Sequence, residues 1–546
     1  MKNLPSPILL IAFAATLFLS SPGTAIAGAD AADRIVEKAR EAAQDDRNAE
    51  SMVLFEQAIA EDPARRMVLL PELADQMTYA GLAEEAAPLY QEYLAAGSPS
   101  PDKARQARLG LALALSWSGE LDASLRAYEA LLNANPDDRE ARLGRARLLS
   151  WRDRQGPSKE AYEEVLLRNP GDLEARTGVG RVQSWRGRQR AAQQQLQDVL
   201  RDHPKDPEAT FLLAQSQTWM GRPDKAQKTL RDYLAGAPED ERARDLLDDI
   251  KFQLRPNTLT DYQESHQSDR LTIRTLSLKQ SLYLNDGRTM LGFRYQNFHY
   301  DPRGTGINRI EVNRPGIYGR HRFSDSFEWN GNVFVDLIDP SNGKNQHETL
   351  TYDTYATFWP NDLLRFDFGS SRTTFDNSKS LLRNVTATYA NVSMDVTPDE
   401  KTRLSLRYNY GEYTDDNIRN WGQVEVERRV LNHPRFLMGW RYTTFKFQDL
   451  RDNGYFNPQS YNSHEMTLKT YGRLGDRFSY YFDGGYGVEH ANPDDFQAIW
   501  NAGTRISYQI VDRLEIEGRY NFFSSATASS GGFERGTSGV NLRFVW

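Results

Sequence analysis

The sequence predicts a multidomain protein of the α + β class, in which a repeated helical solenoid precedes a transmembrane antiparallel β-barrel of about sixteen strands. Three observations support this. Residue types recur every 34 positions in the first half, apolar and polar side chains alternate along the second half, and short and long connections alternate between its strands. We expect a signal peptide at residues 1–27, the solenoid at residues 28–255 and the barrel at residues 256–546.

Residues 1–27 have the layout of a secretory signal. Lys2 gives a basic start, an apolar run of about a dozen residues spans Ile8 to Leu19, and Ala25-Ile26-Ala27 supplies the small-x-small pattern that precedes cleavage. The alternative is an N-terminal membrane anchor, for which the apolar run is too short. The chain has no cysteine, which excludes disulfides, thiolate metal sites and lipid attachment to a thiol.

Proline, tryptophan and small residues mark the period of the helical part. Small residues let the two helices of a repeat approach closely, and proline ends the second helix. The pattern resembles the tetratricopeptide repeat, and we expect about six repeats. The residues spaced 34 apart are Pro136, Pro170, Pro204 and Pro238, then Trp117, Trp151, Trp185 and Trp219, then Ala112, Ala146, Gly180 and Ala214.

The four tryptophans each close the first helix of a repeat, which leaves two interpretations open. In one, they form a ladder that stacks on sugar rings or holds a protein partner. In the other, they pack between neighbouring repeats. Arg147, Arg181, Glu140, Glu174 and Glu208 lie on the same first helices, where we expect a solvated charged face.

The barrel begins soon after Pro256, which ends the last helix and leaves only a short joint. The segment from Arg513 to Phe523 shows the strand pattern: Leu514 and Ile516 share one face, and Glu515 and Glu517 share the other. Side chains of a strand alternate between its two faces. The final residue, Trp546, is aromatic. Strands with one apolar and one polar face, ending in aromatics, are typical of an outer-membrane barrel.

Turn chemistry sets the strand count. Seven short connections rich in Asn, Asp, Gly and Pro alternate with mostly longer polar ones, and such a barrel has short periplasmic turns and long external loops. Seven short turns predict sixteen strands, from about residue 259 to residue 546. The turns lie at Asn285–Gly287, Ser324–Ser326, Asn361–Asp362, Thr397–Glu400, Asn432–Pro434, Gly475–Arg477 and Val511–Asp512.

The alternation also assigns charged side chains to the barrel interior. A charge facing lipid costs roughly 2–4 kcal/mol near the midplane, so we expect apolar neighbours such as Leu404, Phe482 and Leu542 to face outward. The inward charges form either a structural network of neutralising pairs or a hydrated path for a polar polymer. The candidate lumen residues are Arg294, Arg365, Asp367, Arg403, Arg407, Glu425, Glu427, Arg429, Arg441, Glu465, Asp483, Arg505, Glu515, Glu517, Arg519 and Arg543.

Catalytic and cofactor signals are weak. Two pairs of carboxylates, Glu425 with Glu427 and Glu515 with Glu517, have a spacing that glycoside hydrolysis could use, but any strand with an acidic polar face produces such pairs. The eight histidines form no HxH or HxxxH pair. We expect no enzyme activity, no metal and no cofactor. The net charge of −8 argues against a nucleic-acid partner.

One loop carries a more specific signal. The stretch Gly454-Tyr455-Phe456-Asn457-Pro458-Gln459 precedes the twelfth predicted strand. Together with the preceding repeats and the terminal aromatic, it resembles the outer-membrane porins that export bacterial exopolysaccharides, of the cellulose and poly-N-acetylglucosamine type. This chain has far fewer repeats than the cellulose subunits. The loop is either part of the polymer path or a structural turn or plug.

The resemblance implies a sixteen-strand barrel in the outer membrane and a solenoid in the periplasm. It further implies that the partners are a polysaccharide, outer-membrane lipid, and periplasmic or inner-membrane proteins of polysaccharide synthesis. An alternative is a scaffold in which the barrel is only an anchor and the repeats assemble other envelope proteins. A hydrolase or lipid-modifying enzyme with its site in the lumen is a third possibility.

Overall fold

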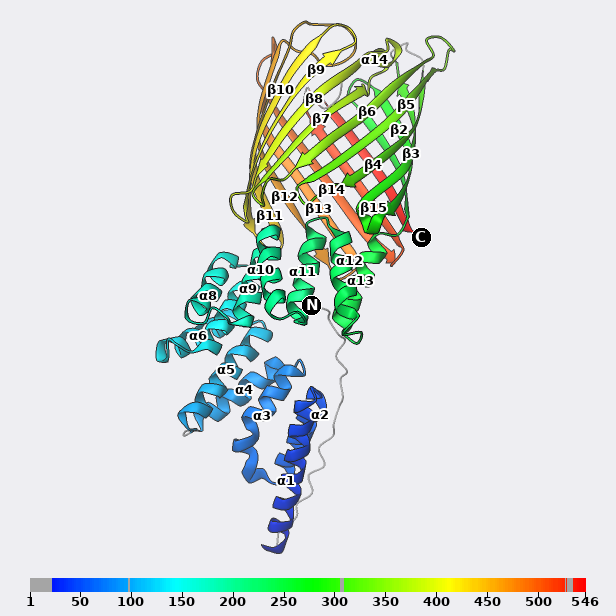
Figure 1. Cartoon of the computed structure of the whole chain (residues 1–546). Helices are drawn as coiled ribbons and strands as arrows, with labels where there is room; N and C mark the ends of the chain where they lie inside the picture. The colour runs from blue at the N-terminus through cyan, green and yellow to red at the C-terminus, as the bar shows by residue number, and fades with distance from the viewer. Residues whose placement is uncertain (1–21, 97–98, 305–308, 526, 528–533) are drawn as a thin grey trace. The chain divides into compact units, whose positions relative to one another are not determined.

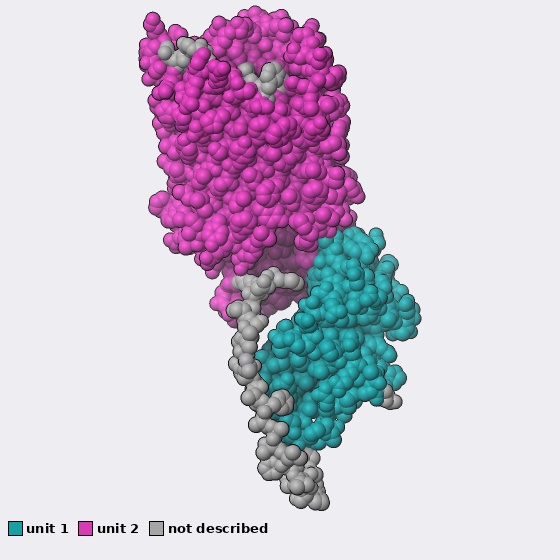
Figure 2. All heavy atoms as spheres, turned by 180° about the vertical axis from the view of Figure 1, so that it is seen from behind, with its two compact units in different colours: residues 1–175 teal, residues 176–546 magenta. Residues whose placement is uncertain are grey.

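A computed structural model describes residues 22–96, 99–304, 309–525, 527 and 534–546. The chain forms two compact units, residues 1–175 and residues 176–546, which Figure 2 colours separately. In the predicted signal peptide, residues 1–21 lie outside the described residues, and the signal stays a prediction.

In the described part of the chain thirteen α-helices precede the first strand, and the first twelve form six consecutive pairs, as the 34-residue period predicts. Buried alanines lie where the helices of a pair meet: the Ser124 hydroxyl donates to the Ala112 carbonyl at 2.6 Å, and the Ser158 hydroxyl to the Ala146 carbonyl at 2.7 Å. The helices are α1 Pro22–Gln44, α2 Asn48–Glu61, α3 Arg66–Tyr79, α4 Ala83–Ala95, α5 Pro101–Trp117, α6 Leu121–Ala134, α7 Arg139–Trp151, α8 Gln155–Arg168, α9 Leu173–Trp185, α10 Gln189–Asp202, α11 Pro207–Trp219, α12 Pro223–Leu234 and α13 Glu241–Gln253.

A second set of 34-residue positions, which the sequence analysis did not use, starts the first helix of several repeats. Asp138, Asp172, Asp206 and Asp240 each accept a hydrogen bond from the backbone amide three residues later, at 2.7–3.1 Å. A carboxylate at this position satisfies an amide that has no partner inside the helix. No helix in the described part of the chain is long and apolar enough to cross a membrane.

Sixteen antiparallel strands follow and close into a barrel in which β1 pairs with β16 (Figure 1). The predicted number of strands is confirmed. The strands are β1 Asn257–Gln267, β2 Leu271–Leu284, β3 Thr289–Pro302, β4 Ile310–Arg322, β5 Phe327–Pro340, β6 His347–Phe358, β7 Leu364–Thr374, β8 Thr386–Val396, β9 Thr402–Tyr413, β10 Ile418–Leu431, β11 Arg435–Phe447, β12 Ser460–Leu474, β13 Phe478–Asn492, β14 Gln497–Val511, β15 Leu514–Ser524 and β16 Glu534–Val545.

The barrel has an apolar exterior and a polar interior. On β16, Val540 and Leu542 are 48% and 43% exposed, whereas Asn541 between them is half-buried and donates to Glu517 of β15 at 2.9 Å. Other outward side chains that are large, apolar and exposed include Phe293, Phe368 and Phe482. An apolar outer surface on a closed sheet is the arrangement that hydrocarbon requires, because every backbone group is paired within the protein.

The chain end helps to close the barrel. The Trp546 indole donates to the Thr258 hydroxyl at 2.9 Å, and the Trp546 amide donates to the Pro256 carbonyl at 2.9 Å. The edges of the first and last strands are therefore joined beyond their ladder, which leaves no free edge.

The two ends of the barrel differ. All seven predicted turns lie at one end, which we call the turn end and where β1 begins and β16 finishes. At the other, the loop end, the short helix α14 Ser378–Leu382 lies between β7 and β8 (Figure 1). Loop-end connections are not all long: residues 268–270 and 414–417 join their strands directly. Alternating lengths are thus only an approximate rule here.

We predict opposite accessibility for the two ends. Because the chain has no cysteine, Ser341→Cys in the β5–β6 loop and Asp476→Cys in the β12–β13 turn each introduce one thiol at an exposed position. A membrane-impermeant maleimide should label Ser341→Cys on intact cells and Asp476→Cys only after permeabilisation. Labelling of Asp476→Cys on intact cells would reverse the orientation.

Candidate functional site: the barrel lumen and its two ends

A network of ion pairs covers one wall of the lumen. Arg441 of β11 contacts Glu425 of β10 at 3.0 Å and Glu465 of β12 at 3.2 Å. Lys469 pairs with Glu427 and lies 3.5 Å from Glu425. These residues come from three adjacent strands and share one face, because neighbouring strands pair in register and side chains alternate. The sequence analysis assigned all of them inward except Lys469, which it missed.

Other predicted lumen residues pair with acids that the sequence analysis also missed. Arg519 of β15 binds Asp261 of β1 at 2.7 Å, across β16. Arg403 of β9 binds Asp395 of β8 at 2.9 Å. Asp261 and Asp395 are on the inward-facing side of their strands. Because side chains alternate along a strand, the sequence pattern could have predicted that both face the lumen.

The remaining predicted lumen residues occupy varied surroundings. Arg365 and Asp367 pair at 2.9 Å, and Arg407 lies 3.7 Å from Glu425. The Arg505 guanidinium lies over the Tyr481 ring, at 4.9 Å from its centroid, and lines a small cavity with Asp483 and Glu517. Glu515 is opposite Arg543 in the β15–β16 register. Strand alternation gives these residues the same parity as the paired lumen residues of their strands, and their role in a polymer path stays a prediction.

A cavity of about 890 Å³ occupies the lumen toward the loop end; we call it the central cavity. Its wall mixes arginines with aromatic rings from many strands, among them Phe298 of β3, Trp421 of β10 and Phe445 of β11. Glutamine, asparagine, serine and threonine side chains fill the spaces between them. Aromatic faces beside hydrogen-bonding groups can hold a ligand that has both apolar and polar surfaces.

The loop that the sequence analysis singled out closes part of this cavity. Tyr455 is 5% exposed and stacks on Tyr413 and Phe375, with ring centroids 4.9 Å and 5.3 Å apart. Its hydroxyl donates to Asp415 at 2.9 Å and accepts from the Asn417 amide at 2.9 Å. Burial raises the pKa of the Tyr455 hydroxyl above its ordinary value, so the hydroxyl stays protonated and remains a hydrogen-bond donor.

Neighbouring loop residues extend this anchor. Phe456 lines the central cavity, Asn457 donates to the Arg451 carbonyl at 2.9 Å, and Pro458 is buried. The loop also binds the β7–β8 connection, where the Ser380 hydroxyl donates to the Asn453 carbonyl at 2.7 Å. The loop therefore forms part of the cavity wall at the loop end, held by an aromatic cluster and by a second loop.

The conformation of Gly454 explains why the loop motif begins with glycine. Its φ of +91° lies in the left-handed region, and a Cβ there would come within 2.3 Å of the Asn377 side-chain oxygen. Only glycine satisfies both constraints without strain.

At the turn end, the second helix of a repeat is capped by a barrel turn. The Asp362 carboxylate, between β6 and β7, accepts hydrogen bonds from the Arg190 and Ala191 backbone amides at the start of α10, at 3.1–3.2 Å. The helix has no side-chain cap of its own. A carboxylate at a helix N-terminus satisfies free amides and complements the helix dipole.

Arginine side chains of the same helix end hold the turn backbones. Arg190 donates to the Trp359 carbonyl at 2.7 Å and to the Asp325 carbonyl at 3.0 Å. Arg188 donates to the Asp362, Thr397 and Pro398 carbonyls at 2.9–3.0 Å. Burial, and then the neighbouring charge of Arg186, lower the pKa of Arg188 from its ordinary value. Because each guanidinium donates to several carbonyls, the two arginines together hold three turns, β4–β5, β6–β7 and β8–β9.

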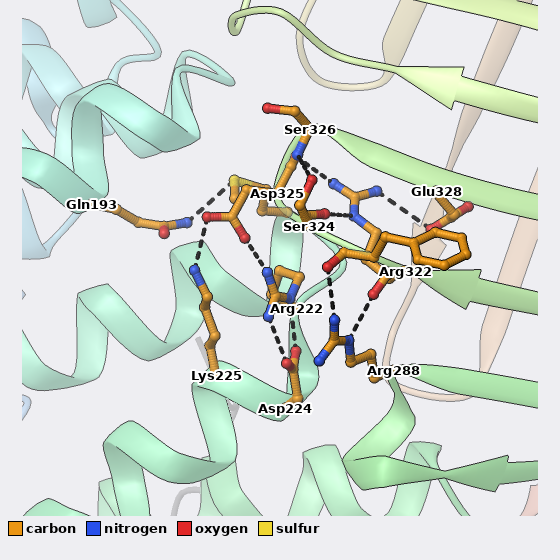
Figure 3. A network of polar contacts seen from close by, with 12 residues as sticks. Gln193, Arg222, Asp224, Lys225, Arg288, Arg322, Ser324, Asp325, Ser326 and Glu328 are labelled. Atoms are coloured by element: carbon orange, nitrogen blue, oxygen red, sulfur yellow. Dashed lines mark hydrogen bonds and ion pairs between the residues drawn. The ribbon is translucent and has the colours of Figure 1, made fainter.

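The next repeat makes equivalent contacts through α12 (Figure 3). Arg222 and Lys225 both pair with Asp325 of the β4–β5 turn, Lys225 at 2.8 Å. Arg231 pairs with Asp286 of the β2–β3 turn at 3.1 Å. Burial opposes ionisation of Asp325, but the bonds and charges of Lys225 and Arg222 outweigh it, so the pKa of Asp325 lies below its usual value.

These contacts explain why the compact units divide within α9 rather than at residue 255. The last helices are attached to the barrel turns by charge pairs, so they belong with the barrel. The sequence carries a signal that was not used: Arg154, Arg188 and Arg222 are 34 residues apart, and the turns at Asp286, Asp325 and Asp362 are acidic.

A second cavity, of about 440 Å³, lies where α10 and α11 meet the barrel; we call it the junction cavity. Trp219 and Met220 at the end of α11 line it together with Trp359 of the barrel. The predicted lumen residues Arg365 and Arg403 line it as well. One member of the predicted tryptophan ladder therefore lies beside the lumen wall.

The four tryptophans are neither fully buried nor fully free. Trp117, Trp151, Trp185 and Trp219 are 46%, 40%, 38% and 51% exposed. Trp117 packs edge-on against Tyr79, with ring centroids 5.8 Å apart. Each ring thus has both a packed part and an exposed part, and binding of a polymer to the exposed part stays a prediction.

Three of the four carboxylates that suggested catalysis, Glu425, Glu427 and Glu517, lie within 4 Å of a cationic side chain. Glu425 and Glu427 pair with Arg441 and Lys469, and Glu517 accepts from Ser507 at 3.2 Å and Asn541 at 2.9 Å. Within the described ranges, no three histidine, aspartate or glutamate side chains gather as a metal site requires.

Comparisons with known proteins agree with the helical part. Family profiles described as "Tetratrico peptide repeat" and "Tetratricopeptide repeat" match residues 68–169 and residues 186–250. The chain therefore carries tetratricopeptide repeats before its sixteen-strand barrel. A search of curated protein sequences found no match.

Several solved structures resemble parts of the chain. A structure titled "Bacterial polysaccharide outer membrane secretin" matches with 12% identity and a TM-score of 0.43, covering 54% of this chain and 99% of that one. PilW, a type IV pilus biogenesis factor, matches with 14% identity and a TM-score of 0.32, covering 40% and 98%. A tetratricopeptide repeat protein from Parabacteroides merdae matches with 18% identity and a TM-score of 0.31, covering 40% and 92%. Identities this low show no shared ligand.

We predict that the aromatic anchor of the loop limits ion flow. Tyr455→Ala removes a buried ring, a change that costs about 3–5 kcal/mol at buried sites, so the loop should loosen. Single-channel conductance in planar bilayers should rise, and it should rise further when Asp452 to Gln459 are deleted. Leu450→Ala, at a 66% exposed position of the same loop, is the matched control. If neither Tyr455→Ala nor the deletion changes the conductance, the loop does not constrict the lumen.

We predict an acid-sensitive contact between α12 and the barrel. A carboxyl whose pKa is lowered in the folded state stabilises it above the unfolded pKa, about 3.9, and loses that contribution as the pH falls further. Hydrogen exchange of α12 amides should therefore be about threefold to fivefold faster in Asp325→Asn than in the wild type at pH 6, a modest effect for a partly exposed pair.

The difference between the two proteins should vanish near pH 2. The control is Asp232→Asn, which removes an exposed ion pair with Lys228 on the same helix. This variant should leave hydrogen exchange of the α12 amides unchanged at both pH 6 and pH 2. A pH-independent difference would contradict the role given to the Asp325 charge.

Proposed function

We propose that this protein exports a polysaccharide across the outer membrane, with its repeats on the periplasmic side. The observation that carries the proposal is the junction cavity, in which Trp219 of a repeat and the lumen residues Arg365 and Arg403 line one space. A surface suited to sugar rings thus leads into a charged lumen. The sequence resemblance to exopolysaccharide porins supports the same function.

The lumen is suited to passage of a hydrated polymer. Its charges are largely paired with each other, as in Arg441 with Glu425 and Glu465, so most of the wall offers only weak polar contacts to a passing chain. Many weak contacts hold a chain while each site releases easily. Sixteen strands also enclose enough width for an aqueous interior.

The repeats at the turn end deliver the polymer, because they are fixed to the barrel. Asp362 caps α10 and Asp325 holds α12, so a chain that leaves the repeat surface enters the lumen without crossing a flexible linker. Other envelope proteins of polysaccharide synthesis bind the earlier repeats. The protein performs no reaction, and direction comes from synthesis of the polymer.

The competing function is a scaffold in which the barrel is an anchor. The ordered loop around Tyr455 favours it, because a permanently closed loop end would prevent export. The two functions differ in whether a blocked lumen stops secretion.

Two adjacent threonines of β11 provide the test. Thr443 lines the central cavity, whereas Thr444 lies in a recess of the outer surface beside Val424 and Tyr442. In cells that make the polymer, Thr443→Cys and Thr444→Cys should both support secretion. A bulky, charged methanethiosulfonate reagent should then block secretion and lower bilayer conductance only in Thr443→Cys.

The control and the contradicting outcome follow from the same pair. Wild-type protein has no cysteine and should be insensitive to the reagent. If modified Thr443→Cys secretes polymer at the wild-type rate, the lumen is not the export path and the scaffold function is correct.

A further inference from the structure

The central cavity carries an excess of positive charge. Five arginines line it, together with only two acidic side chains, Glu465 and Asp376. Three of the arginines have acidic partners: Arg314 binds Asp336 at 2.5 Å, Arg441 binds Glu465, and Arg535 binds Asp376 at 3.2 Å. The other two arginines, Arg294 and Arg419, account for the excess positive charge of the cavity.

Arg294 and Arg419 have only neutral partners. Arg294 donates to the Ser277 hydroxyl at 3.2 Å. Arg419 donates to the Asn409 side chain at 3.0 Å, and its guanidinium lies over the Tyr389 ring at 4.8 Å. Neither forms an ion pair with any residue that the structure describes, and the barrel residues outside the description, 305–308, 526 and 528–533, include no aspartate or glutamate.

A third cation strengthens the field at Arg294. Lys279 of β2 is directly opposite Arg294 in the β2–β3 register. Within the described residues Lys279 has no acidic partner, and its ammonium lies over the Tyr318 ring at 4.6 Å. The carboxylate of Asp261 is already bound by Arg519. Like charges on directly opposed strand positions repel each other. An anion bound in the central cavity next to Lys279 and Arg294 would relieve that repulsion.

Aromatic rings line the same cavity as these two arginines. Phe298 lies four residues along β3 from Arg294 and is itself covered by the Arg314 guanidinium, 4.7 Å from the ring centroid, whereas Trp421 lies two residues along β10 from Arg419. Sugar rings stack on aromatic faces through their apolar C–H surfaces, while a guanidinium binds a carboxylate through paired N–H donors. The two groups together fit a sugar that carries an acid.

We propose that the polysaccharide exported by this protein is acidic, and that Arg294 and Arg419 bind its carboxylates in the central cavity. This inference rests on the proposed export function. The same positive field disfavours a polymer with free amino groups, because unpaired lumen cations repel it.

The experiment uses the full-length protein in planar bilayers with three oligosaccharide probes of similar length. Oligogalacturonate is acidic, a cello-oligosaccharide is neutral and a chitosan oligosaccharide is cationic. We expect oligogalacturonate to block the current at the lowest concentration and the chitosan oligosaccharide at the highest. Reversal potentials in a KCl gradient should show preference for chloride.

Substitution assigns the effect to named residues. Arg294→Gln combined with Arg419→Gln should raise the blocking concentration of oligogalacturonate about tenfold, which is the scale of one charged hydrogen bond, and leave that of the cello-oligosaccharide unchanged. Lys446→Gln is the matched control, since Lys446 is on β11 with outward parity and is exposed. Heat-modifiable migration on gels checks that each variant is a folded barrel.

The outcomes separate this inference from the function on which it rests. Equal block by acidic and neutral probes, or an unchanged acidic block in the double variant, would overturn the inference and leave export standing. No block by any probe, with secretion unaffected by a modified Thr443→Cys, would overturn export and the inference with it.

Discussion

A strand that crosses hydrocarbon must pair its backbone along both edges, and the contact of β1 with β16 meets that requirement for the whole barrel. Each unpaired backbone group in lipid costs several kcal/mol, so closure is not optional. Closure also divides side chains strictly into two faces. Leu542 meets the membrane, and Asn541, its neighbour, meets Glu517 inside. The lumen, its ion pairs and its cavities all follow from that division.

The enclosed charges require partners, and the barrel supplies most of them from adjacent strands. Arg441 lies between Glu425 and Glu465 because three strands pair in register. Where no acid is supplied, as at Arg294 and Arg419, the unpaired cations face the central cavity. Both side chains are half-buried and have no acidic partner among the described residues, which is why we propose that an acidic polymer supplies their counter-charge.

Closure also determines what lies at the two ends. Short turns gather at one end, and their aspartates cap and pair with helices of the last repeats. These contacts join two architectures whose internal periods have nothing in common. At the other end, Tyr455 and its aromatic neighbours hold a loop across part of the opening. The lumen is thus bounded by turns joined to helices at one end and by a loop held by aromatic packing at the other.

The sequence by itself determined the repeats, the number of strands and the side chains that face inward. These features depend on local spacing: 34 residues between Trp151 and Trp185, two residues between Glu515 and Glu517, and turn residues at fixed places. The loop at Tyr455 was also visible as a motif, although its stacking on Tyr413 was not.

Only the tertiary structure decided which charges remain unpaired and where the two halves join. Arg519 meets Asp261, far away in sequence, because the barrel closes. Asp362 caps α10 because a turn and a helix end coincide in space. Such pairings form only where folding brings side chains from remote sequence positions within contact distance. A periodic sequence pattern carries no information about that distance.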